Sequence, residues 1–163
     1  MTNQNMAGLV PANTGPSYWG PGGDRYTFFV SGAQTNGAYS IFEALVPPGG
    51  GPPPHIHHRE EEDFYILEGT LEIRLGDKQL KASAGDFVHT PRGTVHTFRN
   101  AGSTMARMVV FVAPAGLDKY FEEVLEPVRD RSASPPPVTD AVIDRLMAAA
   151  PKYGIEWCET TAA

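Results

Sequence analysis

The sequence has almost no cysteine and no long apolar run. Its one thiol, Cys158, cannot form a disulfide within the chain, and no neighbouring residue marks it as a nucleophile. No apolar stretch approaches the roughly 20 residues that a membrane-spanning helix needs. The opening residues, MTNQNMAGLV, lack the basic and apolar regions of a secretion signal. We therefore expect a cytoplasmic protein without a membrane segment.

Positive charge is scarce as well. Lysine and arginine total 13 against 19 acidic residues, which gives a formal net charge of −6 at pH 7. The arginines of VRDRSA (128–133) alternate with an aspartate, and there is no basic stripe of the kind that binds a phosphate backbone. We therefore expect no nucleic-acid partner.

Glycine and proline, by contrast, are abundant. The chain has 17 glycines and 15 prolines, which recur at short intervals through its first two thirds. We predict that the β-prone segments between them are strands: RYTFFVSG (25–32), AYSIFEALV (38–46), HIH (55–57), DFYILEG (63–69), TLEIRL (70–75), KQLKAS (78–83), DFVHTP (86–91), HTFRN (96–100) and ARMVVFVAP (106–114). Many short strands with tight turns predict an all-β sandwich, jelly roll or barrel.

The pattern changes after Pro114. Apolar side chains there recur at helical spacing: Leu117, Tyr120, Phe121, Val124 and Leu125. A second helix is predicted in TDAVIDRLMAAA (139–150), with Thr139 or Asp140 as its cap. We therefore divide the chain into an N-terminal arm (1–24), a β domain (25–114) and a C-terminal helical extension (115–163), with the helices packed outside the β domain.

Histidine is concentrated in GGGPPPHIHHREEEDFYILEG (49–69). His55 and His57 are two residues apart, so on a strand both side chains point to one face and His58 points to the other. Glu62 lies five residues after His57 and would face away on an unbroken strand. A turn in the polar run HREE (58–61) would bring Glu62 back toward the histidines from a neighbouring strand.

A second histidine group, GDFVHTPRGTVHTFRN (85–100), carries His89 and His96. Pro91 and Gly93 predict a turn that delivers His96 at the start of the next strand. Imidazoles with one carboxylate form a mixed ligand set, which suits Fe, Mn, Co, Ni, Cu or Zn and lacks the thiolates of a typical structural zinc site. Four such ligands would leave coordination positions open for substrate or dioxygen. The competing interpretation is that these histidines are ordinary core or surface residues.

Together the two groups resemble the paired motifs of the cupin superfamily. The first motif, G-x5-H-x-H-x3-4-E-x6-G, is matched by Gly49, His55, His57, Glu62 and Gly69. The second motif, G-x5-P-x-G-x2-H-x3-N, is matched by Gly85, Pro91, Gly93, His96 and Asn100. The two matches and their spacer cover residues 49–100.

This resemblance implies an all-β fold, the double-stranded β-helix or jelly-roll cupin barrel, followed by two C-terminal α-helices. It also implies one divalent transition metal per chain, held inside the barrel by four residues: His55, His57, Glu62 and His96. Glu61 is the alternative carboxylate because the motif allows a shorter spacer, but only Glu62 keeps the six-residue interval to Gly69. We expect His58 in solvent or behind the ligands, and His89 in a structural position.

The sequence around the first motif is similar to that of quercetin 2,3-dioxygenase-like cupins. The similarity implies a metal-dependent dioxygenase that cleaves a flavonol or similar aromatic enol with O2, with Glu62 as the catalytic base. Five aromatic side chains are candidates for lining its pocket: Tyr26, Phe28, Tyr39, Phe64 and Phe98. Two alternatives stay open, namely another small-molecule metal enzyme (an isomerase or a different dioxygenase) and a non-catalytic ligand-binding cupin.

The N-terminal arm also bears on assembly. It carries Tyr18 and Trp19 in a segment rich in glycine, proline and asparagine. Such an arm could pair with the sheet edge of a neighbouring molecule, so we expect a homodimer.

Overall fold

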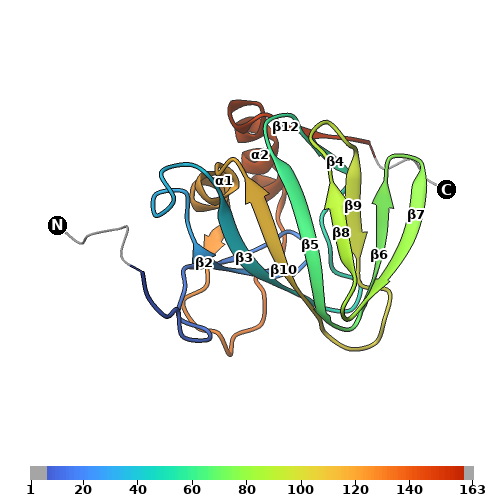
Figure 1. The fold of residues 1–163 in the computed structure, drawn as a ribbon, viewed down its shortest axis with the longest axis horizontal. Coiled ribbons are helices and arrows are strands. Elements are labelled where there is room, and N and C mark those ends of the chain that lie inside the picture. The colour runs from blue at the N-terminus through green and yellow to red at the C-terminus, as the bar shows by residue number, and fades with distance from the viewer. Residues whose placement is uncertain (1–6, 160–163) are drawn as a thin grey trace.

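Two antiparallel β-sheets lie face to face in the computed structural model, which describes residues 7–159 (Figure 1). The larger sheet has seven strands in the order β11 (Glu126–Pro127), β1 (Ser17–Trp19), β2 (Arg25–Val30), β3 (Ser40–Val46), β10 (Ala106–Ala113), β5 (Glu61–Glu68) and β8 (Phe87–Thr90). The smaller sheet has five, in the order β12 (Ile155–Trp157), β4 (His55–His57), β9 (His96–Arg99), β6 (Thr70–Leu75) and β7 (Lys78–Ser83). The helices are α1 (Leu117–Val124), α2 (Asp140–Ala149) and a short 3-10 helix, η1 (Ala150–Tyr153).

Alternation along the strands builds the core between the sheets. In β10 every second residue is buried, namely Ala106, Met108, Val110 and Val112, whereas the residues between them keep partial or full exposure. A strand that faces a second sheet on one side only requires this period of two. The prediction of an all-β jelly roll with two C-terminal helices is thereby confirmed.

A turn at residues 58–60 carries the chain from one sheet to the other. β4 ends at His57 in the five-stranded sheet, and β5 begins at Glu61 in the seven-stranded sheet. Because the chain changes sheets here, Glu62 faces back toward His57, as the sequence predicted. Gly93, at φ 80°, donates its N–H to the carbonyl of His57 over 2.9 Å and joins the turn before β9 to the end of β4.

Asn100 connects the ends of the two motifs. Its side-chain amide donates to the carbonyls of Val46 and Thr104, over 2.9 and 2.7 Å. Its backbone exchanges hydrogen bonds with the turn at Gly49 and Gly50. The buried asparagine therefore fixes where the chain enters the segment that leads to β4.

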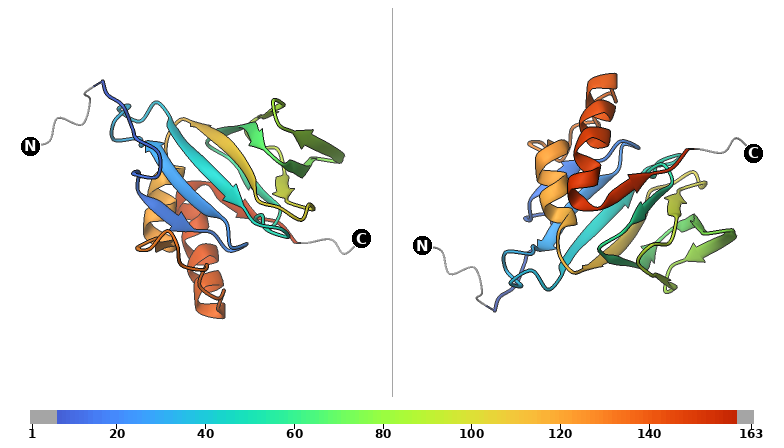
Figure 2. Two further views of the ribbon diagram at one scale, coloured as in Figure 1. Left: turned by 90° about the horizontal axis from the view of Figure 1, so that it is seen from below. Right: turned by 90° about the horizontal axis from the view of Figure 1, so that it is seen from above.

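The C-terminal extension packs α1 and α2 side by side against one end of the sandwich (Figure 2). The hydroxyl of Tyr120 on α1 donates to the carbonyl of Leu146 on α2 over 2.8 Å. The sequence predicted both helices but not β12, which pairs antiparallel with β4 so that Ile155 lies opposite His57. The end of the extension thus becomes part of the barrel.

The aromatic residues of the N-terminal arm lie in a strand that pairs with other strands of the same chain. Tyr18 and Trp19 lie in β1, which pairs with β2 on one edge and with β11 on the other. Among residues 7–159, no helix is long and apolar enough to cross a membrane. The cytoplasmic location and the division into arm, β domain and extension remain predictions.

Candidate metal centre

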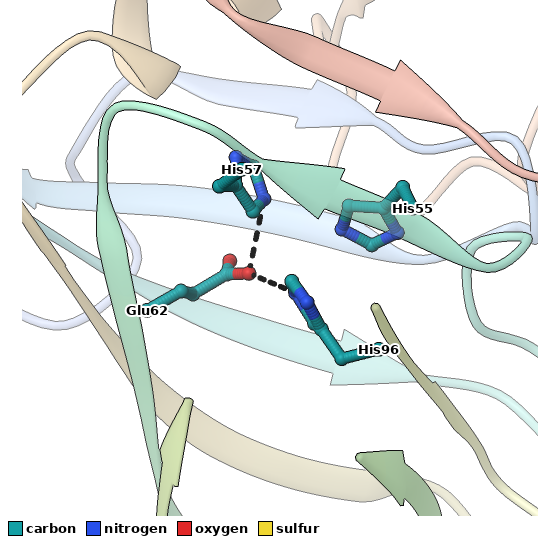
Figure 3. Close-up of side chains that lie close together, drawn as sticks. All are labelled: His55, His57, Glu62 and His96. Atoms are coloured by element: carbon teal, nitrogen blue, oxygen red, sulfur yellow. Dashed lines mark hydrogen bonds and ion pairs between the residues drawn. The ribbon is translucent and has the colours of Figure 1, made fainter. Parts of the chain in front are cut away.

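Four buried side chains meet between the two sheets (Figure 3). His55 and His57 come from β4, and His96 comes from the adjacent antiparallel strand β9, where it lies directly opposite His55. Glu62 reaches the same point from β5 of the facing sheet. The exposed fractions of these residues do not exceed 6%, so the cluster is closed off from bulk water.

The four side chains are close enough to share one ion. Each offers a ligand atom, and these atoms all lie within 4.8 Å of one another. Oε2 of Glu62 lies 2.8 Å from Nε2 of His96 and 3.2 Å from Nε2 of His57. A single divalent metal is the kind of group that such a set of nitrogens and one carboxylate can hold.

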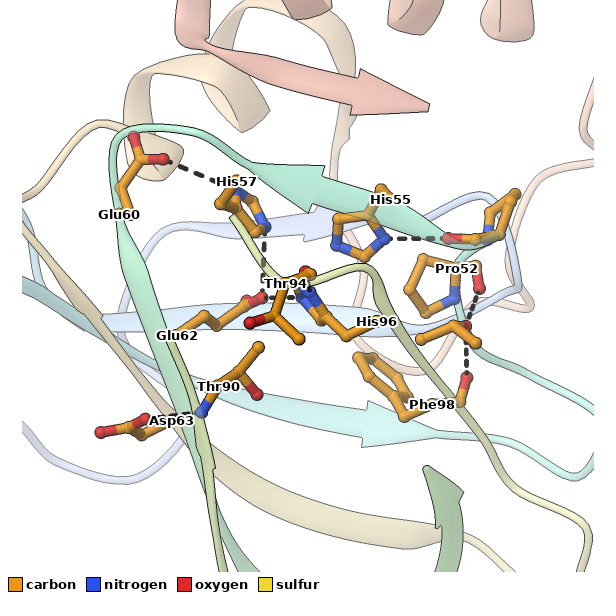
Figure 4. Close-up of polar contacts among 12 residues, drawn as sticks. Pro52, His55, His57, Glu60, Glu62, Asp63, Thr90, Thr94, His96 and Phe98 are labelled. Atoms are coloured by element: carbon orange, nitrogen blue, oxygen red, sulfur yellow. Dashed lines mark hydrogen bonds and ion pairs between the residues drawn. The ribbon is translucent and has the colours of Figure 1, made fainter. Parts of the chain in front are cut away.

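Backbone carbonyls orient two of the three histidines (Figure 4). Nδ1 of His55 lies 2.9 Å from the carbonyl oxygen of Pro53, and Nδ1 of His96 lies 2.9 Å from that of Thr94. A carbonyl oxygen only accepts, so each Nδ1 carries the proton that it donates. In the neutral ring Nε2 is then left with the lone pair that a metal requires.

The third histidine uses a carboxylate instead. Nδ1 of His57 lies 3.5 Å from Oε2 of Glu60, and both side chains are buried. Glu60 was not among the candidate residues from the sequence, because it sits in a polar turn that predicts exposure. Its position three residues after His57 is the one sequence signal that could have pointed to it.

Charge is distributed unevenly over the cluster. Burial, followed by repulsion from His96 and His57, lowers the pKa of His55 well below its usual value. Burial also acts to lower the pKa of His57, but the attraction of Glu62 and Glu60 outweighs it and raises this pKa to about 9. The pKa of Glu62 falls well below its usual value, since His57 and His96 together outweigh the opposing effect of burial. The protein without metal therefore buries an ion pair.

These contacts fit a bound cation. If the ring of His96 carries its one proton on Nδ1, where it faces the carbonyl of Thr94, the lone pair of Nε2 points at the carboxylate of Glu62. Two facing lone pairs repel unless a proton or a metal lies between them. Both ring nitrogens of His57 are buried without a hydrogen-bond partner among the described residues. An ion between Nε2 of His57, Nε2 of His96 and the carboxylate of Glu62 would satisfy these three groups at once.

A cavity of about 40 Å³ adjoins the cluster. His55, His57 and Glu62 form its polar side, and its aromatic wall consists of Tyr26, Phe42, Phe98, Tyr120, Phe121 and Trp157. No lysine or arginine among the described residues lines it. An outer pocket of about 270 Å³ shares Pro21, Leu146 and Trp157 with the cavity, so these three side chains separate the two spaces.

The five predicted pocket aromatics lie in different places. Tyr26 and Phe98 line the cavity. Phe64 is buried beside His96 and Phe98, with ring centroids 6.2 and 5.8 Å apart. Phe28 is in the core but not in the cavity wall, and Tyr39 lies on the outer face of the sheet, 36% exposed.

The sequence did not identify the lining side chains that the C-terminal extension supplies. Four of them are Tyr120, Phe121, Leu146 and Trp157. The helical periodicity around residues 117–125 predicted a buried face, but it could not say that this face covers the histidines.

The other candidate residues lie away from the cluster. Glu61 is exposed at the start of β5. His58 is exposed and lies 2.7 Å from Glu156, and His89 is exposed and lies 2.7 Å from Asp63. Each contact is a surface pair that joins neighbouring elements.

Comparison with known proteins agrees with this fold. Residues 42–112 match the family model of the cupin domain. The quercetin 2,3-dioxygenase of Bacillus subtilis (strain 168) is 31% identical over 64 residues, which are 39% of this chain and 19% of that protein. The match thus spans about a fifth of the relative.

Two solved structures extend the comparison. A predicted oxalate decarboxylase from Thermotoga maritima is 25% identical with a TM-score of 0.58, over 65% of this chain and 98% of that one. An oxalate oxidase in complex with glycolate is 30% identical with a TM-score of 0.51, over 58% of this chain and 53% of that one.

Proposed function

Residues 42–112 make this chain a member of the cupin superfamily, and we propose that it is a metal-dependent dioxygenase that cleaves a flavonol or similar aromatic enol. The observation that carries the proposal is the junction of two unlike surfaces. A buried cluster of three histidines and one glutamate opens on a cavity whose remaining wall is apolar and largely aromatic. A flat aromatic molecule with one acidic hydroxyl matches both surfaces.

Three histidines would hold the metal through Nε2, namely His55, His57 and His96, and a carboxylate oxygen of Glu62 would be the fourth ligand. When bound, a divalent transition metal would lower the pKa of a hydroxyl group that it contacts and offer an open position to dioxygen. The ion itself is Ni, Mn, Fe, Co, Cu or Zn, since this ligand set accepts all of them. The protein's own contribution is to hold the imidazoles in place and to exclude bulk water.

Glu62 would accept the proton of the substrate. Its carboxylate is ionised, because the depressed pKa keeps it so at neutral pH, and it faces the cavity. Transfer of the enol proton to an oxygen of Glu62 leaves the substrate electron-rich toward dioxygen. For quercetin the atoms balance as substrate plus O2 giving a depside plus carbon monoxide.

The size of the cavity limits how a flavonol could enter. A space of about 40 Å³ holds a few water molecules, because one water needs roughly 10–15 Å³ of such volume. A flavonol therefore requires Leu146 and Trp157 to move, which would join the cavity to the outer pocket. Within α2 only Leu146 is buried, so few contacts hold that helix against such a movement.

The small cavity also favours a second candidate, a metal enzyme acting on a compact organic acid. The likeness to an oxalate oxidase supports it. The lining of the cavity argues against this candidate. None of the described residues in it is a lysine or arginine that could bind a second carboxylate. A buried carboxylate without a cation is costly, so the aromatic substrate is the better match.

The test is oxygen-dependent consumption of quercetin by protein loaded separately with Mn, Fe, Co, Ni, Cu and Zn. We expect loss of flavonol absorbance with release of carbon monoxide. E62Q should lower turnover by roughly 10²-fold or more, and should lower it more than it lowers the metal content. E61Q, a matched change at the exposed neighbouring glutamate, should leave turnover unchanged. If no loaded form consumes flavonol, the dioxygenase assignment is wrong, and consumption of oxalate would establish the second candidate.

We also propose that the protein forms a homodimer. The reason is a pair of exposed aromatic side chains and no longer the N-terminal arm. Tyr65 on β5 and Phe87 on the edge strand β8 are cross-strand partners, 46% and 62% exposed. Adjacent exposed aromatics at a sheet edge are typical of an interface. Sedimentation velocity should show a dimer that dissociates in F87K, and a monomeric wild type would contradict it.

A further inference from the structure

Glu60 is buried where its neighbours in the chain are exposed. His58, Arg59 and Glu61 all face solvent in the segment that links the two sheets, whereas Glu60 is only 4% exposed. Removing a carboxylate from water is unfavourable unless a partner compensates for the lost hydration. A surface turn gives no reason to bury this side chain, so its reason must lie in what it contacts.

What it contacts is a residue of the metal cluster. Among the described residues, His57 is the one ionisable side chain within ion-pair distance of Glu60, at 3.5 Å from Nδ1 to Oε2. That oxygen has no hydrogen-bond partner, and neither has Nδ1 of His57. A shift of about 0.5 Å would bring the two atoms to hydrogen-bond length.

The other oxygen of Glu60 is fitted to its surroundings. Oε1 lies against Gly116, the residue before α1, where an added Cβ would come within 2.9 Å of it. That separation is tighter than ordinary van der Waals contact, so the absence of a side chain at Gly116 makes room for the carboxylate. The start of the C-terminal extension thus contacts Glu60 on one side, and His57 lies on the other.

The three histidines are therefore not oriented alike. His55 and His96 each donate from Nδ1 to the carbonyl two residues earlier in the chain. For His57 the equivalent carbonyl would be that of His55, a residue inside β4 that pairs with Trp157 of β12. A carboxylate takes its place, and an ionised acceptor binds an N–H about twice as strongly as a neutral one.

We propose that Glu60 is a positioning residue of the metal centre. It accepts the Nδ1 proton of His57, which fixes the tautomer with Nε2 toward the ion and makes that nitrogen a stronger donor. With Glu62 it brings a second carboxylate into contact with His57. The inference rests on the metal site of the proposed function but not on its substrate.

The test compares variants of the full chain by their affinity for zinc, measured against a chromophoric chelator. E60L removes the acceptor without emptying its space, and we expect zinc to bind about 10- to 100-fold more weakly. E60Q keeps an acceptor oxygen but loses the charge, so its loss should be smaller. E61L makes the same change at the exposed neighbour and should bind like the wild type. If E60L does not fold, E60Q against E61Q provides the same comparison.

A second readout separates orientation from general damage. In the zinc-loaded protein, proton–nitrogen-15 correlation NMR should resolve the Nδ1–H signals of the three cluster histidines. In E60L or E60Q only the signal of His57 should shift or vanish by exchange, while those of His55 and His96 stay. An unchanged His57 signal together with unchanged affinity would overturn the role of Glu60 alone. A wild type that binds no zinc or other divalent ion would instead overturn the metal site and the proposed function with it.

Discussion

The two ends of the barrel interior are built from the same strands but differ in chemistry. Along β5 the inward side chains run from Glu62 to Phe64 and Ile66, and along β9 they run from His96 to Phe98. One end is an ionisable cluster, and the other is a continuous apolar core. Two residues along a strand, about 7 Å, are enough to pass from one to the other.

The difference separates stability from function. Burying a large apolar side chain contributes roughly 1.5–3 kcal/mol, and at the apolar end Phe64, Ile66, Leu71, Ile73 and Met108 are fully buried. At the ligand end burial opposes the charged form of Glu62 and of His57. The apolar end therefore stabilises the fold. The ligand end lowers the stability in part, because it holds four ionisable side chains away from bulk water. Three experiments test whether the two ends differ in this way.

The largest effect is expected at the ligand end, on metal binding. The double variant H55A/H57A removes two of the four ligands and should abolish binding. In the wild type, metal at 100 to 1,000 times its dissociation constant should stabilise the fold by about 3–4 kcal/mol, and a chelator should reverse this. Calorimetry with and without chelator measures the difference. H89Q, a change at an exposed histidine, is the control, and chelator-sensitive melting in the double variant would place the site elsewhere.

The apolar end should show the opposite result. Ile66→Ala leaves a cavity in the core and should lower the free energy of unfolding by about 2–5 kcal/mol. Metal affinity of the folded fraction should change by less than about threefold, since no ligand loses a contact. Glu61→Ala, at an exposed position on the same strand, should cost less than about 1 kcal/mol. Denaturant melts and zinc titrations decide the matter, and a joint loss of stability and affinity in Ile66→Ala would show that the two ends are coupled.

The smallest effect concerns pH and the protein without metal. The pKa of His57 is raised to about 9 from an ordinary 6.5, so its contribution to stability is complete below pH 6.5 and is lost as the pH rises through 9. We expect a loss of about 1–3 kcal/mol over this range. Ile66→Ala should keep the same pH dependence, whereas H57Q should not. With metal present the trend reverses in acid, since below about pH 5 protons compete for the imidazoles and the stabilisation by metal fades. A flat profile for the metal-free wild type would contradict the buried ion pair.

Local sequence patterns were enough to predict the strands and the four residues of the cluster. The pair His55 and His57 required only the period of a strand, and Glu62 required only that the polar run before it (58–61) be a turn. Tyr39 shows where this reasoning fails. Both faces of AYSIFEALV are mostly apolar, so alternation did not decide which face points inward, and Tyr39 lies on the outer one.

The remaining features depend on contacts between distant parts of the chain. IEW (155–157) is too short to be recognised as a strand, and its pairing with β4 comes from tertiary packing. Leu146 and Trp157 line the cavity for the same reason. Glu60 lies in a run of polar residues, and polarity alone predicts exposure, so only the position of His57 and of Gly116 accounts for its burial.

The pairing of β12 with β4 also governs the order in which the protein folds. His57 and Ile155 are neighbours in space but lie roughly 100 residues apart in the chain, so bringing them together carries a large loop-closure entropy. Hairpins such as β6 with β7 close only a short turn and can form early. The strand that carries two of the three histidines thus gains its outer neighbour only when distant parts of the chain meet. We expect metal, which needs this strand in place, to slow unfolding more than it speeds folding.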